Sequence, residues 1–182
     1  MKKVLISIAI FVLFAFSPSK LVKTKVTEGI TISLPPELKP MTEEDVIQRY
    51  PSVRAPLAAY TDLNRTLDFS VNISATQWPD ADLEIAAKFF KSGITNLFDR
   101  IDFIEQGIHT VHKKKYIFFE FESRVNGNKM TLGEQAPVFR YTYIQYLIEP
   151  DRTLVISFNC PKAIREDWQE TVRTMMKSVK VK

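Results

Sequence analysis

The sequence has one cysteine, two histidines and five glycines in 182 residues. Because Cys160 is alone, an intramolecular disulfide is excluded, and so is a disulfide-scaffolded fold. The low glycine content excludes a collagen-like chain. A composition of 45% hydrophobic and 25% charged residues excludes an intrinsically disordered one. These proportions are typical of a globular protein, and the length predicts one domain with a substantial core.

The signatures of common enzymes are also missing. There is no GxSxG elbow, no phosphate-binding glycine loop, no HExxH and no CxxC. His109 and His112, three residues apart on an expected strand, point to opposite faces and are interpreted as edge or surface residues, not metal ligands. Cys160 is in phase with apolar neighbours, which favours a buried, unreactive thiol. We therefore expect no metal, no cofactor and no catalytic residue.

The N-terminus has the order of a secretory signal peptide. Lys2 and Lys3 precede an uncharged apolar run from Val4 to Phe16, and small residues follow at Ser17 and Ser19. The run is shorter than the roughly twenty helical residues that cross a bilayer. We expect residues 1–19 to be removed on export, leaving a periplasmic or secreted protein without a transmembrane span. A buried core helix is the alternative.

The charge of the exported chain argues against nucleic-acid binding. Removal of Lys2 and Lys3, with no acidic residue in 1–19, lowers the formal net charge from +4 to +2. Nonspecific nucleic-acid binding relies on a dense basic face. The one compact basic run, residues 113–115, lies between two apolar segments and is interpreted as a solvated hairpin turn. We expect no nucleic-acid partner.

Hydrophobic periodicity predicts the elements of the fold. From Leu67 to Ala75 apolar residues alternate with polar ones, which indicates a strand with one buried face. From 80 to 99 the apolar period changes to three and four residues, which indicates a helix. Gly93 within this helix is expected to allow close approach to the sheet. Asp80, Asp82 and Glu84 are expected to cap this helix, because the glycine and distal glutamate of a calcium loop are missing.

The remaining segments complete one domain at 29–182, after a polar lead-in at 20–28. A helix is expected at 42–50, begun by Thr42, and another at 163–178. Further strands are expected at 29–34, 56–62, 101–112, 115–124, 138–149 and 152–160. Tight connections favour antiparallel pairing. The order predicts an α+β fold, in which a central antiparallel β-sheet is flanked by helices on both faces.

Several short strings resemble the PsbP-like family. They are Gly29-Ile30-Thr31-Ile32-Ser33-Leu34-Pro35, Arg49-Tyr50-Pro51 with Arg54-Ala55-Pro56, and Ser178-Val179 near the C-terminus. The chain departs from the family at residues 113–115, where glycine is common. The resemblance implies an α/β/α sandwich and a noncatalytic binding or assembly role, and it carries over no active-site residue.

Aromatic residues suggest one candidate surface. On strands 115–124 and 138–149, Tyr116 and Phe118 share a face with Tyr141 and Tyr143 if Phe118 pairs with Tyr143, and Arg140 lies at the edge. An exposed aromatic patch with a polar rim is typical of protein interfaces. The alternative is that a helix covers this face and the rings belong to the core.

Three functions remain open from the sequence. The first is an exported noncatalytic protein that binds or helps to assemble another envelope or secreted protein. The second is an enzyme without a recognisable motif, which predicts convergent titratable groups in a pocket. The third is a carrier of a small apolar ligand between sheet and helix, which predicts an apolar cavity of about 300 Å³ or more.

Overall fold

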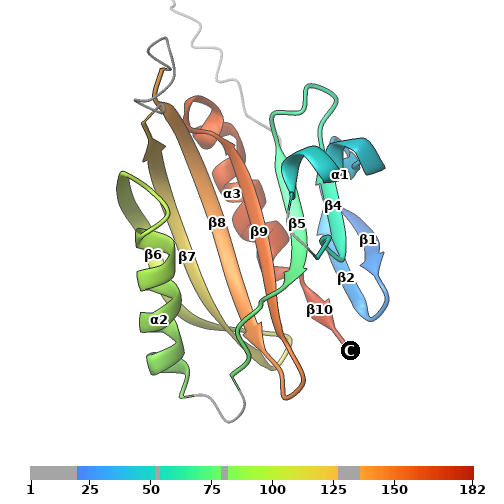
Figure 1. The fold of residues 1–182 in the computed structure, drawn as a ribbon. Coiled ribbons are helices and arrows are strands. Elements are labelled where there is room, and N and C mark those ends of the chain that lie inside the picture. The colour runs from blue at the N-terminus through green and yellow to red at the C-terminus, as the bar shows by residue number, and fades with distance from the viewer. Residues whose placement is uncertain (1–19, 52–53, 79–81, 127–135) are drawn as a thin grey trace, which may run out of the picture.

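The computed structural model describes residues 20–51, 54–78, 82–126 and 136–182 (Figure 1). The signal peptide expected at 1–19 therefore lies outside the described residues. The elements are β1 (Val22–Thr27), β2 (Ile30–Leu34), β3 (Lys39–Pro40), α1 (Glu43–Arg49), β4 (Ala58–Thr61), β5 (Asp68–Ile73), α2 (Leu83–Thr95), β6 (Arg100–Val111), β7 (Lys114–Val125), β8 (Val138–Ile148), β9 (Thr153–Pro161), the 3-10 turn η1 (Lys162–Ile164), α3 (Arg165–Lys177) and β10 (Lys180–Val181).

Seven strands form one antiparallel sheet, in the order β3-β4-β5-β9-β8-β7-β6. Helix α2 lies on one face of this sheet and α3 on the other (Figure 1). The alternating strand β5 turns Phe69 and Val71 into the core beneath α3, where neither is exposed to solvent. The expected α+β architecture, with helices on both faces of an antiparallel sheet, is confirmed.

The segment expected to be a polar lead-in is instead strand β1, so that expectation was wrong. β1 pairs with β2 from Val22 opposite Leu34, and β10 pairs with the other edge of β2. This three-stranded sheet packs on the α3 side, where Ile30 and Ile32 enter the same core as Met175. β1 escaped prediction because lysine and threonine occupy its exposed side. β3 and β10 are only two residues long, too short to give a periodic signal.

The helix starts follow the expected capping chemistry. The Thr42 side chain accepts a hydrogen bond from the Asp45 backbone at 3.2 Å, and the Asp82 carboxylate accepts one from the Glu84 backbone at 2.8 Å. Asp80 lies outside the described residues. Helix α2 ends at Thr95, earlier than expected, and this leaves Leu97 73% exposed. A Cβ atom built on Gly93 would meet nothing within 4 Å, so the expected close approach to the sheet was wrong.

The long hairpins carry the residues of the predicted surface. β7 and β8 pair antiparallel, with Phe118 opposite Gln145 and Glu120 opposite Tyr143. The expected register, with Phe118 opposite Tyr143, was wrong by two residues. A shift of two keeps every side chain on its expected face, because successive strand residues alternate between faces. The grouping of the aromatic residues on one face is therefore unaffected.

Candidate binding surface

The face predicted to bind a partner through its aromatic residues is covered by α3. The rings of Tyr116, Phe118, Tyr141 and Tyr143 are at most 8% exposed and belong to the core that includes Met175 of α3. These rings therefore do not form the candidate exposed patch, and the alternative, in which a helix covers this face and the rings belong to the core, is confirmed. Period-two alternation shows which side chains share a face, but it does not show which face a distant helix covers.

A buried polar network also lies beneath α3. The Glu120 carboxylate is fully buried and accepts hydrogen bonds from the Tyr141 hydroxyl at 3.0 Å, Gln169 Nε2 at 2.6 Å and Arg173 Nε at 2.9 Å. Burial raises the pKa of Tyr141 above its ordinary value, and the nearby Glu120 charge raises it further, which keeps the hydroxyl a donor. The network attaches α3 to the sheet. The sequence signal for this network was Glu120, a charged residue among aromatic residues of the core.

His109 and Cys160, which the sequence raised as candidates for metal or thiol chemistry, both pack against other residues of the fold. The His109 ring stacks on Phe118 with centroids 4.6 Å apart, and its Nε2 lies 3.3 Å from the Gln145 amide oxygen. His109 is half-buried on the edge strand β6, where burial lowers its pKa, and His112 is exposed at the β6–β7 turn, as expected of edge or surface residues. Burial raises the pKa of Cys160 to about 12, as a core thiol requires. Within the described ranges, no three His, Cys, Asp or Glu side chains gather closely enough to hold a metal.

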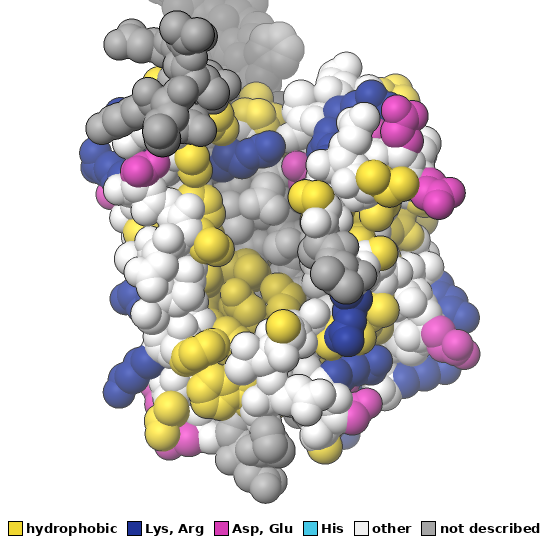
Figure 2. Space-filling view, viewed as in Figure 1, with side chains coloured by type: hydrophobic (Ala, Val, Ile, Leu, Met, Phe, Trp, Pro, Cys, Tyr) yellow, Lys and Arg dark blue, Asp and Glu magenta, His cyan; other side chains and the backbone are white. Residues whose placement is uncertain are grey.

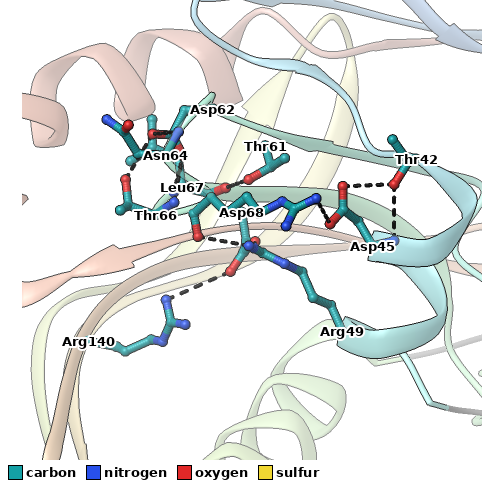
Figure 3. Close-up of polar contacts among 11 residues, drawn as sticks. Thr42, Asp45, Arg49, Thr61, Asp62, Asn64, Thr66, Leu67, Asp68 and Arg140 are labelled. Carbon is teal, nitrogen blue, oxygen red and sulfur yellow. Dashed lines mark hydrogen bonds and ion pairs between the residues drawn. The ribbon is translucent and has the colours of Figure 1, made fainter.

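Arg140 lies on the opposite side of the sheet from the four rings, in a charged cluster (Figure 3). Its Nη1 is 3.7 Å from the Asp68 carboxylate, which also forms an ion pair with Arg49 of α1. Arg49 in turn donates to the backbone oxygen of Arg65 at 2.7 Å, and Arg65 pairs with the buried Asp45 at 3.0 Å. The cluster ties α1 to β5 and to the loop between β4 and β5.

That loop, residues 62–67, is held by Asp62 (Figure 3). One carboxylate oxygen accepts hydrogen bonds from the Thr66 and Leu67 backbone N–H groups, both at 2.7 Å. Burial alone would raise the pKa of Asp62, but these bonds and the Thr66 hydroxyl bring it below the usual value. The loop is thus fixed in shape, although its tip residue Leu63 is 93% exposed. Such a loop presents an apolar side chain at little entropic cost on binding.

The α2 side of the large sheet is covered over only half its width. Helix α2 packs on β6, β7 and β8, where Phe90 stacks on Tyr146 at 4.0 Å. Beyond them, α1 reaches only the start of β5, through the ion pair of Arg49 with Asp68, and no helix of the described residues lies over β9 or the rest of β5. Figure 2 shows a hollow there, between α2 and β5. We call this surface the open face. Its floor consists of half-buried residues from β5 and β9, namely Asn72, Val155, Ser157 and Asn159.

The open face combines a hydrogen-bonded polar part, an apolar part in the middle of the hollow, and charged groups at both ends (Figure 2). The Ser70 and Ser157 hydroxyls are 3.0 Å apart across β5 and β9, and Thr142 donates to Asn159 at 2.6 Å. The cluster of Arg140 and Asp68 closes one end. A cavity of about 920 Å³ occupies the other, lined by Arg54, Asn72, Ile73, Ser74, Ala75, Gln77, Asp151 and Arg152. The sequence did not predict this surface, because the polar positions of β5 and β9 are typical of any strand face that is exposed to solvent.

A second, more apolar groove of about 620 Å³ lies beside the 62–67 loop. Its walls include Leu63 at the loop tip, and Ile164 and Trp168 at the start of α3. Glu37, Lys39 and Asp62 add charges at its border. The groove has the size and lining of a site for an apolar group.

Comparison with known proteins places the fold. No protein-family model matches the sequence, and no curated protein does. The cyanobacterial PsbP protein (CyanoP) of Synechocystis matches with a TM-score of 0.60 and 12% identity, over 92% of this chain and 96% of its own. The Ran-binding protein Mog1p of Saccharomyces cerevisiae matches with a TM-score of 0.54 and 15% identity, over 88% and 96%.

The described part of the chain contains no helix long and apolar enough to cross a membrane. The two structural matches span nearly the whole of CyanoP and of Mog1p, so the likeness concerns a complete domain and not a shared fragment. Identities this low relate architectures and carry no residue roles. The chain has the PsbP-like fold.

Proposed function

We propose that this protein is an exported, noncatalytic binding or assembly protein whose partner is another envelope or secreted protein. The observation that carries the proposal is the open face, a wide hollow with polar and apolar side chains on a domain of the PsbP-like fold (Figure 2). Its floor groups are already hydrogen-bonded to one another, so a partner meets a rigid surface and loses little side-chain entropy there. The yeast neighbour is described as a Ran-binding protein, which is a precedent for protein binding on this fold.

Export rests on the N-terminal sequence. Lys2, Lys3 and the short apolar run have the order that signal peptidases process. N-terminal sequencing of the protein isolated from its own cells would start near residue 20. Recovery of an intact Met1 in the membrane fraction would contradict export.

Binding through the open face can be tested by blocking it. Ala75 is exposed and lines the 920 Å³ cavity, so Ala75→Trp would fill part of the surface without disturbing the core. Thr110→Trp, at an exposed position of the edge strand β6, is the matched control. We expect Ala75→Trp to abolish co-purification of the partner that the wild-type protein and Thr110→Trp retain. Equal recovery with both variants would remove the open face as the binding surface.

The apolar groove supports a second function, that of a carrier of a small apolar ligand. Its volume exceeds the roughly 300 Å³ that such a site needs, and Trp168 lines it. A fatty acid titrated into the protein would quench Trp168 fluorescence in saturable fashion. The Trp168→Phe variant, which keeps only Trp78, would lose that response. A response that persists in this variant would contradict binding in the groove.

A further inference from the structure

Three basic side chains converge on a small cavity near the start of α3. Arg100 of β6, Arg124 of β7 and Lys162 of η1 line a space of about 110 Å³, together with Asp102, Glu122, Ser123 and Phe139. Strand register explains the convergence, because Arg100 pairs with Arg124 and Arg124 pairs with Phe139 in one row across the sheet. Lys162 approaches from the turn that leads into α3.

The carboxylates at this cavity are already paired with cations. Asp102 lies 3.0 Å from Arg100. Glu122 lies 2.7 Å from Arg165 and also forms an ion pair with Lys162. These two carboxylates therefore face four cations, the three that line the cavity and Arg165. The surplus stays positive when the exposed Glu166, 3.7 Å from Arg165, is counted as well.

Among the described residues, Arg124 is the cation at this cavity that has no carboxylate partner. Its guanidinium lies over the Phe139 ring, 5.7 Å from the centroid. Its Nε is buried and has no hydrogen-bond acceptor in the described part of the structure. A buried donor without an acceptor is costly, and an arginine N–H beside a cavity is satisfied best by a charged oxygen.

We propose that this cavity binds a single phosphate-type oxyanion. Its volume of about 110 Å³ is sufficient for one tetrahedral oxyanion. Cations from three elements line the cavity, and an arginine beside such a group can donate two parallel hydrogen bonds to it. The site lies on the α3 side of the sheet, away from the open face, so it is independent of the proposed partner binding. A phosphate group on a larger molecule would enter as the same chemical unit.

The test is a titration of the purified protein with sodium phosphate at constant ionic strength, followed through the arginine Nε–Hε signals in NMR spectra. We expect the Arg124 signal to shift in saturable fashion, and sulfate to compete because it has the same shape. Arg124→Gln should raise the dissociation constant for phosphate about tenfold or more, because a charge-assisted hydrogen bond is lost. Lys162→Gln should also raise the dissociation constant for phosphate. Because the Lys162 side chain is half-exposed, this variant is expected to fold.

The control is Arg152→Gln, which removes a cation at the open-face cavity and should leave phosphate binding unchanged. Three results would overturn the proposal: no saturation, an unchanged dissociation constant in both site variants, or equal weakening in the control. Acetate that shifts the Arg124 signal with the same affinity as phosphate would assign the cavity to carboxylates instead.

Discussion

At the scale of single residues, the fold depends on one fully buried charge. Glu120 has no exposure to solvent, and Arg173 is the cation that reaches it. Removing one partner of a buried ion pair leaves an uncompensated charge, which typically costs about 3–5 kcal/mol of folding free energy. The sequence did not identify this pair, because Gln169 and Arg173 lie off the apolar stripe of their helix.

We expect Arg173→Met to lower the free energy of unfolding by about 3–5 kcal/mol in chemical denaturation. Glu120→Gln in the same chain should restore much of the loss, because the amide still accepts the Tyr141 hydrogen bond without a charge. Arg100→Met, which breaks an exposed pair with Asp102, is the control and should change stability by less than about 1 kcal/mol. A loss in Arg173→Met no larger than in this control would contradict the account.

Buried thiol and phenol groups predict the response to alkaline pH. Burial raises the pKa of Cys160 from 9.0 to about 12 and also raises the pKa of Tyr116 and Tyr143. Between these values the folded chain keeps protons that the unfolded chain has lost, so the free energy of unfolding falls as pH rises above about 9. Denaturant titrations from pH 8 to 11 would show this fall. Cys160→Ala should make it shallower by at most about 1.4 kcal/mol per pH unit; an identical slope would contradict the assigned burial.

At the scale of elements, α2 contains a glycine that its packing does not require. Gly93 is exposed, and a methyl group there would meet open space. Gly93→Ala should stabilise the protein by about 1 kcal/mol, because glycine costs that much inside a helix. The melting temperature should rise by about 2–4 °C for a chain of this size. A lower melting temperature would mean that the bare backbone at Gly93 has a role in packing.

The β6–β7 hairpin shows the opposite case, in which glycine is missing where the backbone favours it. The two turn residues, His112 and Lys113, both have positive φ, 47° and 70°. A two-residue turn of this kind favours asparagine and glycine. Lys113→Gly should therefore stabilise the protein by about 0.5–1 kcal/mol. Glycine relieves the strain of the left-handed backbone conformation, and the greater entropy of glycine in the unfolded chain offsets part of this gain. Lys115→Gly, in the exposed part of strand β7, should instead destabilise it, and equal effects of both changes in thermal melts would contradict this reading.

Elements with a clear period were predictable from sequence, and relations between distant elements were not. The alternation in β5 and the helical stripe ending at Met176 appear directly in the core. The covering of Tyr141 by α3 depends on two segments brought together only by the fold. The same holds for the row of Arg100, Arg124 and Phe139, which requires the register of three strands. Candidate surfaces therefore had to come from the structure.

At the scale of the whole molecule, the two sides of the large sheet have different roles. Helix α3 and the three-stranded sheet cover one side, over an apolar core that also encloses the Glu120 network. On the other side α2 leaves the open face, which has a floor of polar and apolar side chains and a cavity of about 920 Å³ (Figure 2). We propose that the protein meets its partner at this surface.

Site-specific photo-crosslinking in the native cells tests that claim most directly. A photoreactive amino acid replaces Ala75 on the open face or, as the control, Thr110 on the edge strand β6. The account predicts one discrete crosslinked adduct from position 75 and none from position 110. Adducts from both positions in equal yield, or from position 110 alone, would contradict it.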